Sequence, residues 1–374
     1  MRVLHVTPCY PPTWAYGGIP RVVHALACAQ RARGMNVRVW TTDAFDATSR
    51  APVPAQRDDC GVEIHVTRLV SNRLAWTHQL YLPTGPAPLE NVDIVHLHGH
   101  RHLLNWSAFR EARKRGIPVV HTPNGTAPRL ERKVFVKRVW DRVFDGHVPL
   151  EADRVVAVSK AEVRQLLALG VAGDRIVRIP NPLHLAEFAE LPKRGTFRAA
   201  HGLGEGPVVA YLGQITPRKG VDRLVTAFGS GIEGATLVVA GAARGMELPT
   251  APHVRYTGTL EGPDRLALLV DADVLVYPSS DEIFGLVPLE GLLCGVPVVV
   301  GGDCGCGELI GEAGAGLLTR SLDAAELRGH IQTMLTDRER ATGMVERGRR
   351  YIEAHLNPAS VAGAHATMYE ALTA

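Results

Sequence analysis

Residues 274–300, from Val274 to Val300, read VLVYPSSDEIFGLVPLEGLLCGVPVVV. Two short valine-rich runs enclose a segment of helix length that starts near Leu286, which is the pattern of a strand, a helix and a second strand. A connection of this kind joins two parallel strands of one sheet. The stretch therefore predicts a parallel α/β architecture.

The same alternation extends over the rest of the chain. Helical patterns such as Arg21–Arg33, ended by Gly34, and Ala161–Leu169 separate the β-branched runs. We predict six strands in the first half and six in the second: Val3–Thr7, Val37–Thr42, Glu63–Val66, Ile94–His98, Val119–Thr122 and Arg154–Val158, then Val208–Leu212, Thr236–Ala240, Val254–Tyr256, Val274–Tyr277, Val296–Val300 and Gly316–Leu318.

The pattern loosens in the middle of the chain. After Ile176–Pro180 come Asn181-Pro182, the segment Leu191–Gly195 and the segment Gly202–Pro207, which indicate a connection between domains. A length of 374 residues also suits about two domains. We therefore predict two Rossmann-like domains. An eight-fold barrel is the alternative, and it would require evenly spaced units without a central break.

Composition limits the class of protein. With 46% hydrophobic and 21% charged residues, the chain lies in the range of soluble globular proteins, which excludes a disordered or fibrous chain. No apolar run near either end approaches the ~20 residues of a membrane-spanning helix, and the start lacks the layout of a signal peptide. The six cysteines are scattered, so we expect reduced thiols and a cytoplasmic location: Cys9, Cys28, Cys60, Cys294, Cys304 and Cys306.

Charge is unevenly distributed along the chain. Residues 1–180 contain 25 Lys and Arg against 15 Asp and Glu, whereas the remaining residues contain 16 against 23. A basic first half and an acidic second half suggest two bodies with different electrostatic roles. A drift of surface charge without function is the alternative.

Two glutamates lie at the start of the helix predicted near Leu286. Glu282 precedes it and Glu290 lies about one turn inside it, so both side chains can face one cleft. Ligands of open α/β sheets bind beyond the carboxyl ends of the strands, and helix N-termini attract phosphate. Ionised carboxylates accept hydrogen bonds from sugar hydroxyls. The segment suits a ligand with phosphate and sugar groups, although two solvated surface glutamates would show the same spacing.

The surrounding residues carry a more specific signal. Glu282 and Glu290 enclose Phe284-Gly285-Leu286 and are followed by Cys294-Gly295-Val296-Pro297. Other motifs occur in order along the chain: Gly17-Gly18, Pro180-Asn181-Pro182, Gly213, Lys219-Gly220-Val221-Asp222 and Glu308 after the glycine-rich run 301–307. Over essentially its whole length the chain resembles the retaining glycosyltransferases of the GT-B fold, family four. The resemblance implies an α/β protein with two Rossmann-like domains that face each other across a deep cleft.

The same resemblance implies a nucleoside diphosphate sugar as donor, held mainly by the second domain. Glu290 would accept hydrogen bonds from the ribose hydroxyls, and Glu282 would contact the transferred sugar. The backbone amides around Phe284, Gly285 and Leu286 would meet the diphosphate and the sugar. Lys219 would offset the negative charge that develops on the leaving diphosphate.

Basic and glycine residues near the donor differ in how well they match the family. Relatives usually carry Arg directly after the glycine of the preceding strand, where this chain has Gln214. Arg218, next to Lys219, would supply the missing charge, or else it is a solvated loop cation. In the first domain, Gly17 and Gly18 permit positive φ angles and a close approach of the backbone, which favours a loop over the donor phosphates and the acceptor.

The first domain departs from the family after the strand that ends near residue 122. Many relatives end this strand with Thr-x-His-Gly, and that histidine reaches the donor sugar or the acceptor. In this chain Asn124 stands at the histidine position, and His121 lies three residues earlier. Asparagine keeps a hydrogen-bond donor and an acceptor but does not titrate near neutral pH. We therefore predict that Asn124 positions the sugar and that His121 packs beside the strand without a chemical role.

The run His96-Leu97-His98-Gly99-His100-Arg101-His102 raises the question of a metal site. Strand alternation puts His96 and His98 on one face, as a pair of metal ligands would need. No Asp, Glu or Cys set nearby in the sequence completes a site, and the enzymes that this chain resembles need no metal. We therefore favour histidines that line the cleft between the domains. Cys304 and Cys306 are too closely spaced and too solitary for a zinc site.

A basic segment spans residues 129–142. Its six Lys and Arg residues alternate with Val134, Phe135, Val136, Val139 and Trp140. Such a helix would lie on an anionic membrane surface near a lipid-linked acceptor. A core helix with a solvated basic face is the alternative.

The resemblance to this family implies a metal-independent enzyme without a bound cofactor. It would transfer a glycosyl group from the donor to a hydroxyl with retention at the anomeric carbon, by same-face attack in which the leaving phosphate takes the acceptor proton. The protein then supplies positioning and charge stabilisation, so no catalytic-base carboxylate is needed. Residues 1–185 with the helix 356–374 would bind a sugar or lipid-linked glycan acceptor of polysaccharide or lipopolysaccharide assembly. Residues 186–355 would bind the donor, and we expect no nucleic acid partner.

Three other functions are alternatives. A sugar-nucleotide epimerase on the same fold would bind a similar donor but would need no acceptor. A nicotinamide-dependent oxidoreductase would carry Gly-x-Gly-x-x-Gly after a strand, which the loops after Val3–Thr7 and Val208–Leu212 lack. A binding module without catalysis would keep the fold but would not retain all three of Glu282, Glu290 and Lys219, which this chain does.

Overall fold

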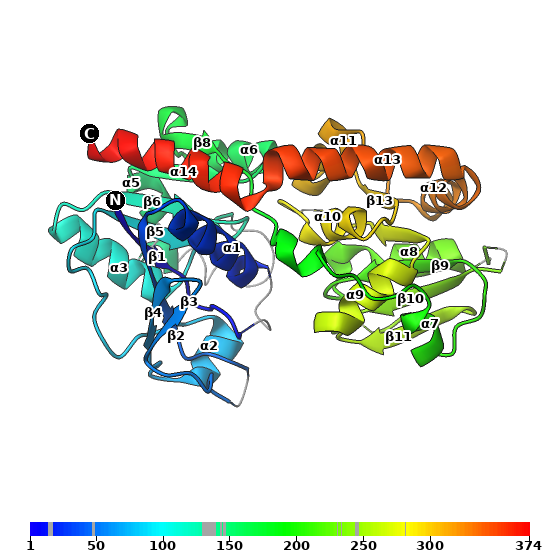
Figure 1. The fold of residues 1–374 in the computed structure, drawn as a ribbon, viewed down its shortest axis with the longest axis horizontal. Helices are drawn as coiled ribbons and strands as arrows, with labels where there is room; N and C mark the ends of the chain where they lie inside the picture. The colour runs from blue at the N-terminus through cyan, green and yellow to red at the C-terminus, as the bar shows by residue number, and fades with distance from the viewer. Residues whose placement is uncertain are drawn as a thin grey trace. The chain divides into compact units, whose positions relative to one another are not determined.

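The computed structural model describes residues 1–13, 18–46, 49–128, 140–142, 144, 147–229, 231–232, 234–243, 247–280 and 282–374. Its contacts divide the chain into an N-terminal unit (Met1–His184 with His355–Ala374) and a C-terminal unit (Leu185–Ala354). These limits lie within one residue of the boundaries that the sequence suggests. Each unit contains its own open, largely parallel sheet (Figure 1), which excludes a single barrel.

The N-terminal unit has eight strands in the order β3-β4-β2-β1-β5-β6-β7-β8. Neighbouring strands are parallel except β3 and β4, which form an antiparallel hairpin at one edge. The strands are β1 (Arg2–Val6), β2 (Asn36–Thr42), β3 (Gln56–Asp59), β4 (Val62–Thr67), β5 (Ile94–His98), β6 (Val119–Thr122), β7 (Arg154–Ala157) and β8 (Ile176–Arg178).

The prediction of six strands in this unit is wrong by two, β3 and β8. β3 has the sequence QRDD and no buried residue, so pairing within the hairpin defines it rather than an apolar pattern. β8 has only three residues, none of them fully buried. Neither strand offers the alternation of apolar and polar residues by which a strand is identified in a sequence.

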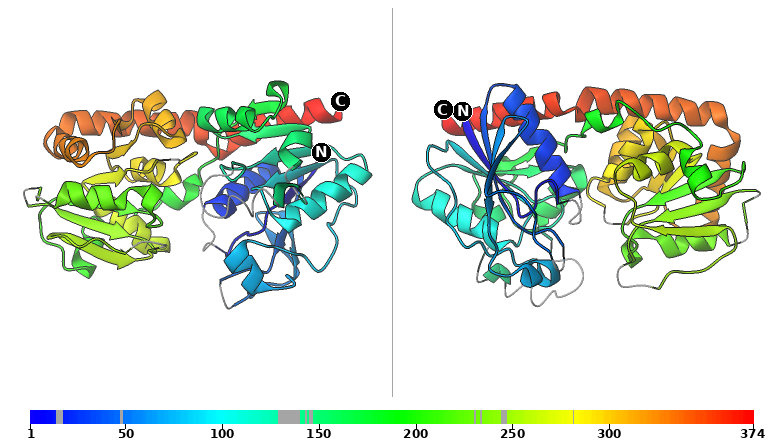
Figure 2. Two further views of the ribbon diagram at one scale, coloured as in Figure 1. Left: turned by 180° about the vertical axis from the view of Figure 1, so that it is seen from behind. Right: turned by 60° about the horizontal axis from the view of Figure 1, so that its bottom comes forward.

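Helices cover both faces of the N-terminal sheet (Figures 1 and 2). They are α1 (Ile19–Ala32), α2 (Asn72–His78), α3 (Leu103–Lys114), α5 (Val148–Glu151), α6 (Lys160–Ala168), the 3-10 turn Gly173–Arg175 and α14 (Pro358–Thr373). One core layer joins Val3 of β1 to Leu26 of α1 and Tyr369 of α14. The other joins Leu4 of β1 to Leu104 of α3. Alternate residues of the strands thus pack into the core layers on the two faces of the sheet. The helix α14 packs against α1.

The C-terminal unit has six parallel strands in the order β11-β10-β9-β12-β13-β14, so the prediction of six strands is confirmed. They are β9 (Val208–Leu212), β10 (Thr236–Ala240), β11 (Val254–Gly258), β12 (Val274–Tyr277), β13 (Val298–Gly301) and β14 (Gly316–Thr319). The chain runs outward from β9 in one direction and from β12 in the other. The order therefore reverses between β9 and β12, which is where open α/β sheets bind ligands.

Helices and short turns complete this unit. They are the 3-10 turns Leu185–Phe188 and Pro217–Lys219, α7 (Thr196–Ala200), α8 (Val221–Phe228), α9 (Gly262–Asp271), α10 (Leu286–Leu293), α11 (Gly305–Ala313), α12 (Ala324–Thr336) and α13 (Arg338–Tyr351), after which the π-helical turn Ile352–Leu356 leads to α14. The helix predicted to begin near Leu286 is confirmed as α10.

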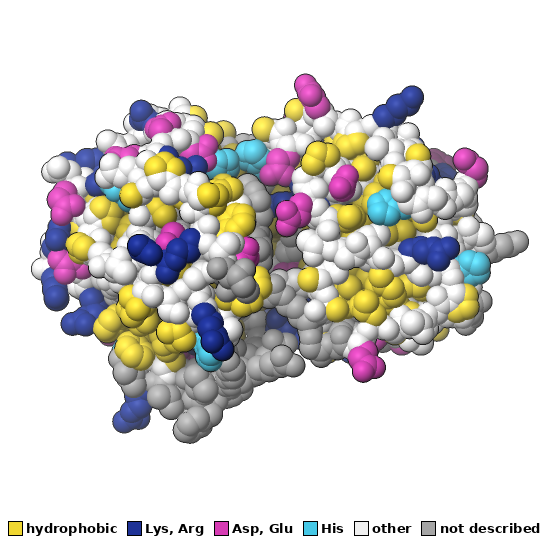
Figure 3. Space-filling model, turned by 90° about the horizontal axis from the view of Figure 1, so that it is seen from below, with side chains coloured by type: hydrophobic (Ala, Val, Ile, Leu, Met, Phe, Trp, Pro, Cys, Tyr) yellow, Lys and Arg dark blue, Asp and Glu magenta, His cyan; other side chains and the backbone are white. Residues whose placement is uncertain are grey.

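The surface reflects the uneven charge of the sequence. Figure 3 shows Lys and Arg side chains spread over the visible face of the N-terminal unit, at the left of the view. Among the described residues, no helix is both long and apolar enough to cross a membrane. Most of the basic segment 129–142 lies outside the described residues, so its predicted helix stays a prediction.

Candidate active site

Three residues meet at the carboxyl ends of β9 and β12. Lys219, in the turn that follows β9, donates from Nζ to the hydroxyl oxygen of Tyr277 at 2.8 Å and also pairs with the Glu282 carboxylate. The Tyr277 hydroxyl in turn donates to Glu282 Oε2 at 2.9 Å. The Lys219 and Glu282 side chains are 20% and 22% exposed, so a ligand can reach both. The structure therefore brings Lys219 and Glu282 together at the point where the strand order reverses.

Tyr277 is the member of this group that the sequence analysis missed. It is the last residue of β12, and its ring centroid lies 4.9 Å from Lys219 Nζ. Burial raises the pKa of the Tyr277 phenol well above its ordinary value, and the negative charge of Glu282 raises it further. The phenol therefore stays protonated at neutral pH and acts as a hydrogen-bond donor to Glu282.

The loops around Lys219 and Glu282 pack closely against one another. Gly220 has φ 66°, and a Cβ there would collide with the carbonyl of Pro278. Gly285 has φ 73°, and a Cβ there would collide with Cys306. Only glycine combines this backbone conformation with such close contacts. The start of α11 packs against the same loops, because Gly305 N donates a main-chain hydrogen bond to Glu282 O at 2.7 Å.

The N-terminus of α10 opens beside this group. Gly285 is its N-cap, and no described side chain forms a capping hydrogen bond there. The first amides of a helix have no partner within the helix, so those of Leu286 and Val287 suit an anionic group. Phe284, just before the cap, is 5% exposed and belongs to the packing of the loop.

Glu290 lies in a second ionic group, separate from Lys219. It is 5% exposed and forms an ion pair with Arg265 of α9, whose other terminal nitrogen donates to Glu187 Oε2 at 2.7 Å. The sequence analysis missed Arg265 and Glu187. Helix packing alone brings these three residues together, so no motif signals the contact. The ion pair with Arg265 fixes the orientation of the Glu290 carboxylate.

Two other basic and polar positions near the carboxyl ends of β9 and β12 have structural contacts. Arg218 is half-buried, and its carbonyl accepts hydrogen bonds from the backbone N (3.0 Å) and the hydroxyl (3.3 Å) of Ser280. Gln214 is exposed, and its carbonyl accepts from the Tyr211 hydroxyl at 2.7 Å. These hydrogen bonds use the backbone carbonyl groups of Arg218 and Gln214 and do not involve their side chains.

The structure describes one residue of the glycine pair before α1. Gly17 lies outside the described residues. Gly18 is the exposed N-cap of α1, with φ −78° and ψ −24°, which any residue adopts. Gly18 therefore does not use the positive φ angle that glycine permits, and Pro20 lies in the first turn of the helix.

Asn124 lies directly beyond β6 with φ 53°, in the left-handed region that asparagine tolerates better than most residues. Its Oδ1 accepts a hydrogen bond from Asn181 Nδ2 at 3.0 Å, and its Nδ2 lies 3.4 Å from the carbonyl of Thr122. His121, in β6, is fully buried and donates from Nε2 to the carbonyl of Gly99 at 2.9 Å. Burial lowers the pKa of His121 to about 4, so it is neutral near pH 7.

Glu162 is a buried carboxyl group beside Asn124 that the sequence analysis also missed. It accepts hydrogen bonds from the backbone N atoms of Gly125 (2.6 Å) and Val158 (2.8 Å). Burial raises its pKa to about 7. The pattern Ser159-Lys160-Ala161-Glu162 is a capping box at the start of α6, and this signal in the sequence identifies the helix start.

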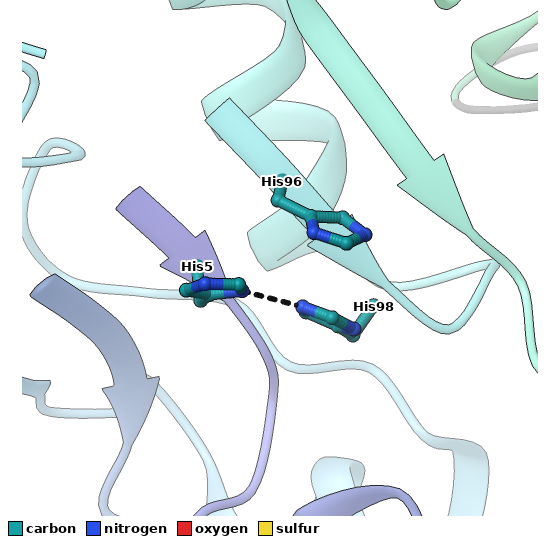
Figure 4. Close-up of side chains that lie close together, drawn as sticks. All are labelled: His5, His96 and His98. Atoms are coloured by element: carbon teal, nitrogen blue, oxygen red, sulfur yellow. Dashed lines mark hydrogen bonds between the residues drawn. The ribbon is translucent and has the colours of Figure 1, made fainter. Parts of the chain in front are cut away.

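His96 and His98 lie on one face of β5, and His5 of β1 joins them (Figure 4). All three rings are buried in the core of the N-terminal unit, because β1 and β5 are central strands paired in register at His5 and His96. The expectation that these histidines line a cleft is therefore wrong. Burial lowers the pKa of His5 to about 4 and holds those of His96 and His98 well below the ordinary value.

The hydrogen bonds of this histidine cluster run in one direction. Gln30 Oε1 can only accept, so His5 donates to it from Nε2 (2.7 Å) and accepts at Nδ1 from His98 Nε2 (2.8 Å). Gln30 Nε2 donates to the Tyr369 hydroxyl at 3.3 Å, which leaves the phenolic proton for the Nδ1 atom of His96, 2.6 Å away.

The chain of bonds ends at Thr122, whose hydroxyl lies 2.6 Å from His96 Nε2. Both nitrogens of His5 and of His96 are thus engaged with neutral partners. We interpret the cluster as a hydrogen-bonded core that joins β1 and β5 to α1 and α14, rather than as a metal site.

Comparison with known proteins identifies the class of protein. Residues 193–351 match the family described as "Glycosyl transferases group 1", and residues 17–182 match the "Glycosyl transferase 4-like domain". Between them the two matches span most of the chain, which belongs to this family of GT-B glycosyltransferases.

Individual relatives agree over nearly the full length. The chain is 27% identical to a D-inositol 3-phosphate glycosyltransferase of Nocardia farcinica, over 91% of this chain and 82% of that protein. It is 28% identical to a GDP-mannose-dependent alpha-(1-6)-phosphatidylinositol monomannoside mannosyltransferase of Mycobacterium tuberculosis, over 94% of both. Its fold resembles that of sucrose-phosphate synthase from Thermosynechococcus elongatus, with a TM-score of 0.76 at 21% identity, over 99% of this chain and 98% of the other.

Proposed function

We propose that the chain transfers a glycosyl group from a nucleoside diphosphate sugar to a hydroxyl acceptor, with retention at the anomeric carbon and without a catalytic metal. The observation that carries the proposal is the group of Lys219, Tyr277 and Glu282 beside the uncapped N-terminus of α10. A diphosphate needs fixed positive charge and N–H donors, and a sugar needs acceptors for its hydroxyls. This one place in the C-terminal unit offers all of them.

Each residue has a separate task in this proposal. The amides at the start of α10 hold the diphosphate, and Lys219 stabilises the charge that develops on it as the sugar leaves. An ammonium group has three N–H donors, and its bonds to Tyr277 and Glu282 use two of them, which leaves one to meet a phosphate oxygen. Glu282 accepts from hydroxyls of the transferred sugar. Arg218 adds positive charge to the same loop in place of the arginine that Gln214 replaces.

Glu290 binds the ribose of the donor. Its carboxylate is buried and is held by Arg265, so it is oriented before a ligand arrives. A carboxylate accepts hydrogen bonds from two neighbouring hydroxyls, which is the pattern that a ribose presents.

The N-terminal unit binds the acceptor, with Asn124 as a hydrogen-bonding residue and Gly17-Gly18 as part of the loop over the ligands. The relatives named above act, by their names, on an inositol phosphate and on a phosphatidylinositol mannoside. They support a polyol, a sugar or a lipid-linked glycan as acceptor, in glycolipid or polysaccharide assembly. The positive charge of residues 1–180 suits an acceptor with phosphate and a peripheral contact with the cytoplasmic face of an anionic membrane.

A panel of nucleotide sugars scored by thermal shift tests the donor site. A ligand present at about 100 times its dissociation constant adds about 2.7 kcal/mol to the stability of the folded state. We expect one nucleoside diphosphate sugar and its free nucleotide to raise the melting temperature. No shift with any member of the panel would contradict the proposal.

The same donor, incubated with and without acceptor alcohols, separates the alternatives. A transferase consumes the donor productively only when an acceptor is present. An epimerase converts the donor sugar without an acceptor, and a binding module leaves the donor unchanged while still being stabilised by it.

A further inference from the structure

Two distant segments of the N-terminal unit bring two thiols, an imidazole and a carboxylate together. His24 and Cys28 lie four residues apart on one face of α1. Asp59 and Cys60 lie in the turn between β3 and β4. One ligand atom from each of His24, Cys28 and Cys60 lies within 4.8 Å of the others.

The contacts in this cluster have the spacing of ligands around a small ion. A tetrahedral zinc ion, bound at about 2.0–2.1 Å by nitrogen or oxygen and at about 2.3 Å by sulfur, places its ligand atoms roughly 3.3–3.8 Å apart. Here His24 Nε2 lies 3.6 Å from Cys28 Sγ and 3.2 Å from Asp59 Oδ2. Cys60 Sγ lies 3.6 Å from the other carboxylate oxygen of Asp59. Small shifts of side chains would complete the tetrahedron.

The turn that carries Cys60 is held against α1. Cys60 and Gly61 both have positive φ angles, 54° and 74°, as in a tight hairpin turn. Gly61 N donates to Asp58 Oδ1 at 2.9 Å, and Gly61 O accepts from Arg31 Nε at 2.8 Å. Arg31 lies one further turn along the face of α1 that carries Cys28. Two hydrogen bonds therefore hold the turn that carries Cys60 in place beside α1.

A buried hydroxyl beside the cluster supports the same conclusion. Tyr10 is 2% exposed, and its hydroxyl has no hydrogen-bond partner among the residues that the structure describes. Its ring centroid lies 5.7 Å from that of His24. A thiolate or carboxylate bound to a metal ion would accept a hydrogen bond from this hydroxyl. Groups around metal sites commonly form such hydrogen bonds to the ligands.

We propose that His24, Cys28, Asp59 and Cys60 bind one thiophilic divalent cation, such as Zn²⁺. Each thiol loses its proton as it binds, and the neutral imidazole coordinates through Nε2. Cys60 is exposed and Asp59 is 27% exposed, so the ion has a path from solvent. The ion would fasten the polar hairpin β3–β4 to α1, which is the structural role that four-ligand sites of this kind have. This site is independent of the function proposed above.

The proposal is tested on the full chain, stripped with a chelator and kept reduced with a phosphine. Titration with Co²⁺ should produce thiolate-to-metal absorption that saturates at one equivalent, and Zn²⁺ should displace the Co²⁺. Cys28→Ser and Cys60→Ser should each weaken binding by at least about 100-fold, since changes at outer groups alone cost about 10–100-fold. Cys294→Ser, a half-buried thiol of the C-terminal unit, is the matched control and should bind as the parent does.

Far-UV circular dichroism of the metal-free variants shows whether they fold like the metal-free parent, which separates loss of a ligand from loss of structure. Variants that fold and still bind one equivalent as tightly as the parent would overturn the proposal. Absence of thiolate absorption in the reduced parent would overturn it as well. A Cys28–Cys60 disulfide in the untreated protein, with no cation bound after reduction, would also do so and would identify a redox pair instead.

Discussion

One polar cluster of the N-terminal unit differs in burial and charge from the ionic groups of the C-terminal unit. In the N-terminal unit, His5, His96 and His98 form a neutral hydrogen-bonded chain deep in the core. In the C-terminal unit, Lys219 pairs with Glu282 and Arg265 pairs with Glu290, in groups that lie around β12 and α10. Neutral bonds join structural elements at little electrostatic cost, whereas charges held at strand ends can act on a charged ligand. The comparison separates residues that hold the fold from residues that we propose to contact the donor.

Acid should affect the two units unequally, and this is the largest effect that we expect. Burial lowers the pKa values of His5, His121 and His365 to about 4, whereas an unfolded histidine has about 6.5. As the pH falls below 6.5, the unfolded chain takes up protons that the folded chain refuses, so stability is lost between pH 6.5 and 4. At pH 5 each such histidine costs roughly 2 kcal/mol. Glu162, with its pKa of about 7, opposes the trend as a single group.

Tryptophan fluorescence measures this effect in one unit, because all five tryptophans fall within residues 1–184. Thermal melts followed by fluorescence should shift strongly downward from pH 7 to pH 5. Melts of the C-terminal unit, followed by hydrogen exchange of its strands, should shift less. Equal shifts in both units would remove the distinction between the buried histidines of the N-terminal unit and the ionic groups of the C-terminal unit.

Lys219→Met should reduce turnover by about 10²–10³-fold, the scale of removing one group that stabilises developing charge. Methionine keeps the length of the side chain and removes only the ammonium. Lys193→Met, an exposed lysine of the same unit, is the matched control and should retain parental turnover. Steady-state rates with saturating donor decide the matter, and a Lys219→Met enzyme as fast as the control would exclude the phosphate role.

Glu290→Gln should weaken binding of the free nucleoside diphosphate by about 1–3 kcal/mol. The substitution replaces a charged hydrogen-bond acceptor with a neutral amide, which forms weaker hydrogen bonds. Glu282→Ala should instead lower turnover more than nucleotide affinity, since the proposed contact of Glu282 is with the sugar rather than the ribose. Calorimetric titration with the nucleotide, beside turnover, measures both. Parental affinity in Glu290→Gln would disprove the ribose role, and equal losses of affinity and turnover in Glu282→Ala would indicate a folding defect.

Asn124→Ala should lower turnover about 10–100-fold, the scale of one or two positioned hydrogen bonds. Part of any loss would come from backbone strain, because Asn124 has φ 53°. Asn124→Gly removes the same amide without that strain and should lose as much turnover while folding normally. His121→Ala should lose much less. The reverse ranking, with a group titrating near neutral pH that disappears in His121→Ala, would give the role to His121.

Much of the fold could be predicted because most strands of the C-terminal unit are short apolar runs, followed in most cases by a recognisable helix. β3 could not, because a polar hairpin strand forms by pairing with β4 rather than by burial. Lys219 and Glu282 were predicted as site residues from their motifs, and the structure brings them together. Arg265 and His5 were not, because their partners lie 25 and 93 residues away and only helix packing or strand order brings them close.

The central claim is that the charged group of the C-terminal unit serves retaining glycosyl transfer. Nuclear magnetic resonance of the reaction mixture tests it most directly, with the donor identified by thermal shift, an acceptor alcohol and no added divalent cation. The account predicts a new glycosidic bond with the anomeric configuration of the donor, formed only when acceptor is present. An inverted product, an epimerised donor or no reaction with any acceptor would contradict it.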